Sequence, residues 1–392
     1  MKKWLKGVVG LGVSAMMAMS MAGCGTTGEE VVSNGGNSVK TDNTKKDSAK
    51  TDNAKTDDAT TTGDTEDKVK VGVAMPTKDL QRWVQDGENM QKELEAAGYE
   101  VDLQYANNDI ATQVAQIENM VSNNCDLLVI ASIDGTALGT ALQGAKDADI
   151  PVIAYDRLIM QSDAVSYYAT FDNELVGTLQ GEYIEEALDL KNSDGPYNIE
   201  LFTGSPDDNN CNFFFGGAMK VLQPYIDNGK LVVKSGSTTL AECATLNWST
   251  EEAQKRMENI IAAYYSDGTQ LDAVLSSNDS VANGITNALV ASYNGEFPVL
   301  TGQDCDITSM KNILASKQSM SIFKDTRTLA AQVVKMVTAI VEGKDVPVND
   351  TETYDNGTGI IPSYLCEPVF ADANNYKELL IDSGYYTEEQ LK

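Results

Sequence analysis

The chain has 392 residues, and its 58 Asp and Glu outnumber its 29 Lys and Arg, which gives a formal net charge of -29. A surface that acidic repels nucleic acids and anionic lipid headgroups, so the composition argues against both as partners. The chain also contains no histidine. Catalytic triads and metal sites that need imidazole are therefore excluded, and we expect no metal and no other cofactor.

The N-terminal residues 1–23 have the pattern of a secretory signal. Three lysines precede an apolar run at 7–21, which ends at Ala22-Gly23-Cys24. This run is too short and wrongly flanked for a stable membrane span. The small residues before Cys24 resemble a lipobox, in which the cysteine is diacylated and becomes the new N-terminus. Plain secretion with cleavage elsewhere is the alternative.

The segment that follows, 24–67, has the composition of a flexible tether. After Cys24 it consists mainly of Thr, Asp, Asn, Lys, Gly and Ser, and the motif KTDN at 40–43 and 50–53 recurs as KTDD at 55–58. Such a segment cannot bury enough apolar surface to offset the conformational entropy of ordering it. We therefore expect a disordered, lipid-anchored tether that holds the rest of the chain away from a membrane.

The region after the tether alternates between strand-like and helix-like runs. Apolar runs typical of strands occupy 69–75, 99–106, 126–132 and 151–156. Helices are expected between them: one with Leu80, Trp83, Val84, Met90 and Leu94 near helical spacing, one near 110–124 and one near 136–148. Continuous apolar strands separated by helices predict a parallel sheet covered on both faces.

The same alternation starts again near residue 198. Strands are expected at 198–204, 231–237, 272–278, 298–304 and 319–325, and helices near 212–226, 250–266, 280–293, 307–316 and 326–342. The segment 360–365 is a late strand or a crossing between domains. This region is longer than one core usually serves, so we predict an α/β fold with two doubly wound parallel-sheet lobes.

Five predicted strands end in charged or amide residues, in the motifs AYDR (154–157), GSPDDNN (204–210), SSND (276–279), GQD (302–304) and FKD (323–325). Ligands of open parallel sheets bind beyond the carboxyl ends of the strands, so the recurrence predicts one polar ligand held by several strand ends. A ligand with many hydroxyls fits, because Asp, Asn, Arg and Lys each make two or more hydrogen bonds. The aromatic residues available to pack on the C–H faces of a pyranose are Trp83, Phe213, Phe214, Phe215 and Trp248.

Longer motifs carry a resemblance to a known family. They include AMPTKDLQRW (74–83), VIAYDRLI (152–159), ELFTGSPDDNN (200–210), SIFKDTR (321–327) and GYYTEEQLK (384–392). Through them the region 69–392 resembles the type I periplasmic sugar-binding proteins of ABC importers, above all their xylose-binding and multiple-sugar-binding members. The resemblance implies an extracytoplasmic protein that delivers a monosaccharide to ABC permease subunits. Together with the pattern at Cys24, it predicts a monomer that is anchored to the cell membrane only by the lipid on this cysteine.

The resemblance also implies a hinge of three segments between the lobes, with crossings near 170–172, 322–325 and 360–364. On this division 68–171 and 325–362 form the N-terminal lobe, and 172–324 and 363–392 form the C-terminal lobe. A sugar would close the lobes only if it contacted both of them, because a ligand without differential affinity shifts no equilibrium.

Ten sugar-binding residues follow from the resemblance, motif by motif. Arg82 and Trp83 are implied to meet the sugar from the first lobe, the tryptophan by stacking, and Asp156 and Arg157 to hold ring hydroxyls or the ring oxygen. The residues implied to bind from the other lobe are Asp208, Asn210, Asn278, Asp304 and Lys324 through hydrogen bonds, and Trp248 by covering the opposite face of the ring. Lys78 and Phe214 are further candidates.

Each of these residue types also has a structural interpretation. The alternatives are a core position for Trp83, a surface ion pair for Asp156 and Arg157, and helix-capping positions for Asp208, Asn210, Trp248 and either Asn278 or Asp279. The remaining cysteines are Cys125, Cys211, Cys243, Cys305 and Cys366. Their spacings fit no zinc pattern, and either one disulfide among the last four or buried free thiols would account for them.

Three other functions compete with transport. A sugar-sensing receptor would present the closed form to a chemoreceptor or sensor kinase. A glycosidase would pair carboxylates such as Asp156 and Asp304, but Arg157 and Lys324 nearby would lower their pKa values when a general acid needs a raised one, so we expect no enzyme. A sugar-responsive repressor would carry an N-terminal helix-turn-helix domain, where this chain carries a signal and a tether.

Overall fold

The computed structural model describes residues 68–392. The predicted signal 1–23, the tether 24–67 and Cys24 lie outside the described residues. Among the residues that are described, none of the helices combines the length and the apolar character needed to cross a membrane.

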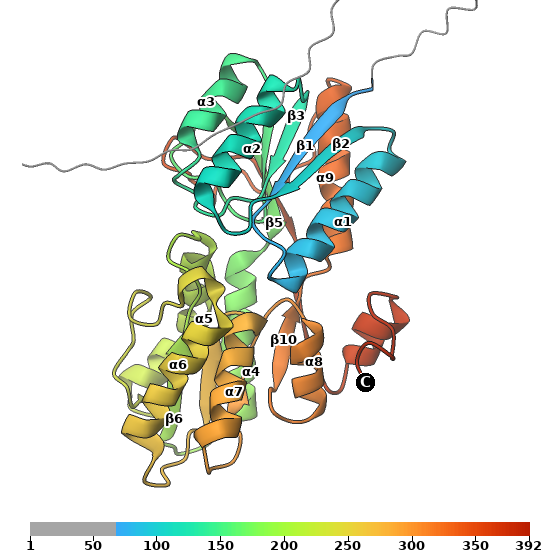
Figure 1. The fold of residues 1–392 in the computed structure, drawn as a ribbon. Coiled ribbons are helices and arrows are strands. Elements are labelled where there is room, and N and C mark those ends of the chain that lie inside the picture. The colour runs from blue at the N-terminus through green and yellow to red at the C-terminus, as the bar shows by residue number, and fades with distance from the viewer. Residues whose placement is uncertain (1–67) are drawn as a thin grey trace, which may run out of the picture. The chain divides into compact units, whose positions relative to one another are not determined.

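The first lobe is built on a six-stranded parallel sheet in the order β11-β5-β4-β3-β1-β2. Its strands are β1 (Lys70–Met75), β2 (Glu100–Tyr105), β3 (Leu127–Ile130), β4 (Val152–Tyr155), β5 (Val165–Phe171) and β11 (Ser363–Cys366). Its helices are α1 (Gln81–Ala96), α2 (Ile110–Ser122), α3 (Gly139–Asp147) and α9 (Thr326–Val341). Figure 1 shows this sheet between the pair α2 and α3 and the pair α1 and α9.

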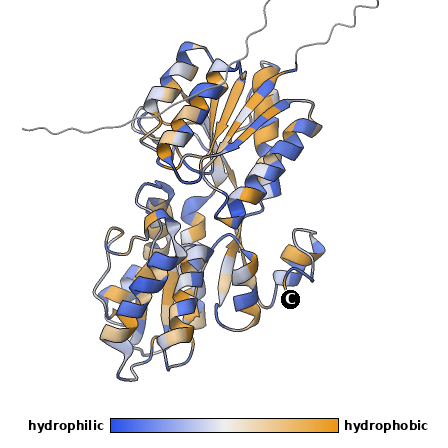
Figure 2. Cartoon of the chain, viewed as in Figure 1, coloured by the Kyte–Doolittle hydropathy of each residue, from blue (hydrophilic) through white to orange (hydrophobic). Residues whose placement is uncertain are grey.

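Side-chain alternation along the strands explains why this sheet is covered on both faces. Val71, Val73 and Met75 pack with residues of α1 and α9, whereas Ala74 packs with residues of α2 and α3. Figure 2 shows the apolar strands inside and helices with polar residues on their outer faces. The sheet and the helices therefore follow the predicted arrangement.

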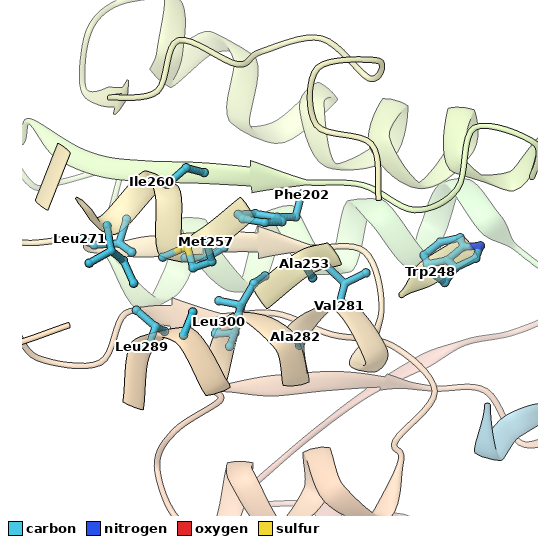
Figure 3. Packing of buried hydrophobic residues seen from close by; sticks show 14 of the residues in the cluster. Phe202, Trp248, Ala253, Met257, Ile260, Leu271, Val281, Ala282, Leu289 and Leu300 are labelled. Atoms are coloured by element: carbon cyan, nitrogen blue, oxygen red, sulfur yellow. The ribbon is translucent and has the colours of Figure 1, made fainter. Parts of the chain in front are cut away.

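The second lobe contains a four-stranded parallel sheet in the order β7-β6-β8-β9. Its strands are β6 (Tyr197–Phe202), β7 (Leu231–Val233), β8 (Ala273–Ser276) and β9 (Val299–Leu300), and its helices are α4 (Asn173–Ala187), α5 (Asn210–Asp227), α6 (Thr250–Ile260), α7 (Asp279–Ser292) and α8 (Ile307–Leu314). Short helical turns occur at Leu246–Trp248, Ile261–Tyr265 and Lys377–Asp382. Figure 3 shows the buried cluster around Phe202, Met257 and Leu300, with Trp248 at one end of it.

The predicted strand at 319–325 does not join the parallel sheet of the second lobe. Residues Met320–Phe323 form β10, which pairs antiparallel with β12 (Val369–Asp372) in a separate two-stranded sheet. Its link to the loop after β9 is an isolated bridge between Gln303 and Ile322. The strand is apolar enough for a sheet interior. Its partner strand comes from the last crossing segment, and a pairing between segments so far apart in sequence cannot be predicted from local patterns.

Two other expectations need correction. The elements β5 and α4 were not predicted from the sequence, and they follow each other directly at the first crossing. The strand β11 pairs with β5 in the first sheet, so the third crossing lies after Cys366 and residues 363–366 belong to the first lobe. At two crossings the next helix is capped by an aspartate, since Asp172 accepts from the N–H of Leu175 and Asp325 from that of Arg327.

Candidate ligand-binding cleft

A cavity lies where the two lobes meet, and all ten predicted site residues line it. The full lining is Leu80, Arg82, Trp83, Asp156, Arg157, Asp208, Asn210, Phe214, Trp248, Asn278, Gln303, Asp304 and Lys324. These residues lie at the start of α1, near the start of α5, beyond the carboxyl ends of β4, β6, β8, β9 and β10, and just before α6. Residues from five motifs that are far apart in sequence therefore meet in one cavity, as expected for polar residues beyond the carboxyl ends of strands.

Arg82 is the cation with the most carboxylate partners in the cleft. Its Nε and Nη2 donate to Oδ2 of Asp86 at 2.9 and 2.7 Å, and the guanidinium also pairs with Asp156 at 3.0 Å and Asp304 at 3.4 Å. Burial lowers the pKa of Arg82, but the carboxylates outweigh burial and hold it well above its ordinary value. The hydroxyl of Tyr155 donates to the other oxygen of Asp86, so this buried carboxylate fixes the guanidinium.

The main chain of Asp156 is held in an unusual conformation at the end of β4. Its φ is 59°, in the left-handed region that Asp adopts more readily than most residues. Its carbonyl accepts hydrogen bonds from the hydroxyl of Tyr168 (2.6 Å), the hydroxyl of Thr170 (3.0 Å) and Nδ2 of Asn210 (2.8 Å). Because Asn210 belongs to the second lobe, the last of these bonds joins the lobes.

The carboxylate of Asp156 points into a cationic surrounding. Oδ2 lies 3.0 Å from Arg82 and 3.8 Å from Lys324. Burial raises the pKa of Asp156, but Arg82, Lys324 and Arg157 outweigh burial and hold it below its ordinary value. Asp156 is therefore an ionised hydrogen-bond acceptor at neutral pH.

Arg157 makes a second ion pair between the lobes. Its Nε lies 3.0 Å from Oδ2 of Asp208, and its Nη1 donates to the carbonyls of Ser132 and Ile133, both at 3.1 Å. Burial raises the pKa of Asp208. The surface ion pair considered for Asp156 and Arg157 is wrong, since both residues are buried and they pair with different partners.

Lys324 and Asp304 complete the charged set. The ammonium of Lys324 lies 3.1 Å from Oδ1 of Asp304 and faces the rings of Phe171 and Phe214 at 5.9 and 5.8 Å from their centroids. Lys324 follows β10, so it projects from the middle crossing toward both lobes. Its side chain is buried.

Three aromatic rings line the cavity, those of Trp83, Phe214 and Trp248. The ring of Trp83 lies next to two guanidiniums, with their central carbons 4.5 Å (Arg82) and 5.1 Å (Arg157) from the ring centroid. Trp248 contacts Phe214 edge to face at 6.3 Å between centroids, and its Nε1 is buried without a hydrogen-bond partner. Trp83 is thus both a core residue and a lining residue, which joins the two interpretations considered for it.

The capping interpretation holds for one of the amide residues. Asn278 accepts from the N–H of Val281 and caps α7 with its Oδ1, while it also lines the cavity. The helix α5 begins at Asn210 itself, and the side chain of the cap residue Asn209 makes no capping hydrogen bond to a backbone N–H. Asp208 accepts from the N–H of Asn210 at 3.0 Å, so it supports this turn as well as pairing with Arg157.

The sequence reasoning missed some residues and included one that lies elsewhere. Leu80 and Gln303 line the cavity, and Phe214, a further candidate, does so too. Gln303 donates its Nε2 to the carbonyl of Ser277 and keeps a buried Oε1 without a partner. The other candidate, Lys78, is exposed and faces the ring of Tyr105 outside the cavity.

The five cysteines between residues 68 and 392 are all free and buried, which selects the free-thiol interpretation. The thiol of Cys211 lies near the cleft and donates to the carbonyl of Ser205, and burial raises its pKa well above the ordinary value. No group of three or more Cys, Asp or Glu in this part of the chain is placed to hold a metal ion.

Comparison with known proteins identifies the family. The model of the periplasmic binding protein domain matches residues 71–345. The multiple sugar-binding periplasmic receptor ChvE of Rhizobium radiobacter is 54% identical over 330 residues, which cover 83% of this chain and 93% of that protein. The chain belongs to the type I periplasmic sugar-binding proteins.

Two further relatives agree with this membership. The D-xylose-binding periplasmic protein of Escherichia coli K12 is 36% identical over 324 residues, covering 83% of this sugar-binding protein and 93% of the relative. An ABC transporter solute binding protein from Clostridium phytofermentans, solved with bound β-D-glucose, is 72% identical with a TM-score of 0.82 and covers 82% of this chain and 100% of its own. The predicted family, fold class and extracytoplasmic location are confirmed. The relatives are binding receptors, which agrees with the expectation that this sugar-binding protein is not an enzyme.

Proposed function

We propose that the protein captures a monosaccharide, an aldopentose or aldohexose such as xylose, glucose, galactose or arabinose, and delivers it to the permease of an ABC importer. The observation that carries this proposal is the cavity lined by charged, amide and aromatic side chains of both lobes. Support comes from the C. phytofermentans relative, an ABC transporter protein with β-D-glucose, and from the xylose-binding relative. A sugar that contacts both lobes favours the closed form, which is the form a permease would bind.

The ten predicted site residues have complementary roles in this proposal. The carboxylates of Asp156, Asp208 and Asp304 accept hydrogen bonds from sugar hydroxyls, and the cations Arg82, Arg157 and Lys324 donate to hydroxyl and ring oxygens. Asn278 caps α7 with its oxygen, so its Nδ2 is available to donate, while the Nδ2 of Asn210 already holds the carbonyl of Asp156. Trp83 and Trp248 pack on the two faces of the ring.

The electrostatics around Asp156 favour binding over hydrolysis. A glycosidase needs one carboxylic acid with a raised pKa, but the cations around Asp156 lower the pKa of this carboxyl. Charge-assisted hydrogen bonds to hydroxyls need an ionised carboxylate, and the cations around Asp156 favour the ionised form of this residue.

We extend the proposal to the N-terminus, where Cys24 would carry the lipid that anchors the protein and 24–67 would be the tether. The sequence pattern at Ala22-Gly23-Cys24 supports it. Labelling of expressing cells with a radioactive fatty acid would test this anchor. The parent chain is expected to incorporate the label, and the Cys24→Ala variant is not.

A second role would use the same closed form. ChvE is described as a receptor, so a sensor kinase or chemoreceptor is a candidate partner besides the permease. Pull-down of the sugar-loaded protein by the extracytoplasmic domain of a candidate sensor kinase would support this role, and sugar-independent binding would speak against it.

A thermal-shift screen tests the proposed function directly. The purified protein is heated with xylose, glucose, galactose, arabinose, ribose or fucose, and a ligand at 100 times its dissociation constant is expected to stabilise it by about 2.7 kcal/mol. Calorimetric titration then gives the affinity of each positive sugar. The proposal fails if no pentose or hexose shifts the melting temperature or produces heat of binding.

A further inference from the structure

We infer that Tyr386 is a positioning residue that stabilises the closed arrangement of the lobes. Its hydroxyl group lies at what we call the Tyr386 junction, which consists of Tyr386, the side chains of Gln81 and Gln85, and the carbonyl of Cys305. The inference rests on the proposed function, since it concerns how tightly the same cleft holds a sugar.

The hydroxyl of Tyr386 makes every hydrogen bond that a hydroxyl can make. It donates to the carbonyl of Cys305 at 3.0 Å and accepts from Nε2 of Gln81 at 2.6 Å and Nε2 of Gln85 at 3.2 Å. A hydroxyl has one donor and two acceptor positions, so the site is saturated. The side chain is 3% exposed, so water competes little for these bonds.

The members of the junction belong to different lobes. Tyr386 packs in a buried cluster with Cys305, Met310 and Phe323, around β10 and α8 of the second lobe. Gln81 and Gln85 lie on α1, which packs on the sheet of the first lobe. Opening the cleft therefore separates the tyrosine from the two glutamines.

Two residues of the junction are sequence neighbours of charged residues that line the cleft. Gln81 precedes Arg82, and Cys305 follows Asp304, the partner of Arg82 across the lobes at 3.4 Å. The Oε1 of Gln81 also accepts from the N–H of Ile307 at 3.1 Å, at the start of α8. The junction thus sets the distance between α1 and the loop that carries Asp304.

None of the four junction residues lines the cavity. Their bonds favour the closed form whether or not a sugar is bound, so they raise the fraction of molecules competent to hold one. The dissociation constant is inversely proportional to that fraction. Loss of the junction is therefore expected to weaken every sugar by the same factor, whereas loss of a lining residue weakens different sugars unequally.

The test compares Tyr386→Phe with the parent chain in calorimetric titrations against D-glucose, D-xylose and L-arabinose. Loss of one buried hydroxyl with three partners is expected to raise each dissociation constant about two- to tenfold, by equal factors. The matched control is Tyr376→Phe, because Tyr376 lies in the same segment and its hydroxyl makes no hydrogen bond within residues 68–392. This control is expected to leave each constant unchanged.

A second variant approaches the junction from the other lobe. Gln85→Met is expected to weaken the sugars by a similar common factor, and combined with Tyr386→Phe it should add less than its separate effect. Equal affinities of Tyr386→Phe and parent, or factors that differ among the sugars, would overturn the inference. Small-angle scattering of the sugar-free chains measures closure without a ligand. A larger radius of gyration for Tyr386→Phe than for the parent supports the inference even where no tested sugar binds. An unchanged radius of gyration opposes it.

Discussion

The substitution Asp304→Asn is the sharpest probe of the cleft because it changes one charge and no volume. Oδ1 of Asp304 contacts Lys324 at 3.1 Å and Arg82 at 3.4 Å, and the residue lines the cavity. An ionised acceptor that a sugar hydroxyl contacts contributes about 1.5–3 kcal/mol, so the dissociation constant is expected to rise about ten- to 150-fold.

The fold is expected to survive this change. After the substitution Arg82 keeps Asp86 and Asp156, and Lys324 keeps Asp156 at 3.8 Å, so neither cation is left buried and alone. The charge of Asp304 also helps to raise the pKa of Asp306, and its removal relieves this repulsion. The two effects oppose each other, so the free energy of unfolding should change by no more than about 1 kcal/mol.

Two assays separate binding from folding. Calorimetric titration with D-glucose and D-xylose measures affinity, and differential scanning fluorimetry without sugar measures the melting temperature. Asp79→Asn is the matched control, since Asp79 is an exposed aspartate near the start of α1 and outside the cavity lining. Unchanged affinity of Asp304→Asn would refute the role assigned to the carboxylate, and a loss of cooperative unfolding would show that the residue is structural.

Three further predictions concern other positions in the chain. A Cβ at Gly204 would collide with the ring of Trp248, so Gly204→Ala should displace the ring, lower stability by about 1–3 kcal/mol and weaken sugar binding in titrations. Burial, and then the charge of Asp304, raise the pKa of Asp306 to about 7, above the value of about 3.9 in the unfolded chain. The folded state therefore binds the extra proton, and its stability falls as the pH rises through this interval. In urea unfolding at pH 5 and pH 8, Asp306→Asn should lessen that fall in stability. Cys24→Ala should move the protein from the membrane fraction to the soluble extracytoplasmic fraction.

The sequence was sufficient to predict the cleft residues that directly follow the ends of strands. Continuous apolar runs predicted most of the parallel strands, and polar residues that follow neighbouring strands of one parallel sheet lie at the same edge of that sheet. The missed helix α4 shows the opposite case. Gly177 and Gly181 disfavour a helix locally, but a Cβ at Gly177 would collide with the carbonyl of Phe214 on α5, so close packing of two helices requires the glycine.

Two residues of the cleft illustrate what local patterns can and cannot reveal. Asp86 stands four residues after Arg82, a spacing that places both on one face of a helix, so the sequence contained the signal for this ion pair. Gln303 had no such signal beyond its neighbour Asp304. Its position is fixed by a hydrogen bond to the carbonyl of Ser277, which comes from another strand end.

The backbone of the cleft explains why its polar residues are hard to replace individually. Asp156, Trp248 and Asp304 have φ angles of 59°, 54° and 99°, all in a region that costs most residues on the order of 1 kcal/mol or more. At Asp156 the compensation is visible, because three side chains donate to its carbonyl, one of them Asn210 from the opposite lobe. Closure therefore stabilises the strained peptide that aims the Asp156 carboxylate. The orientation of this acceptor and the closure of the lobes are coupled through one carbonyl group, so an opened cleft presents a less ordered acceptor to the sugar than a closed one.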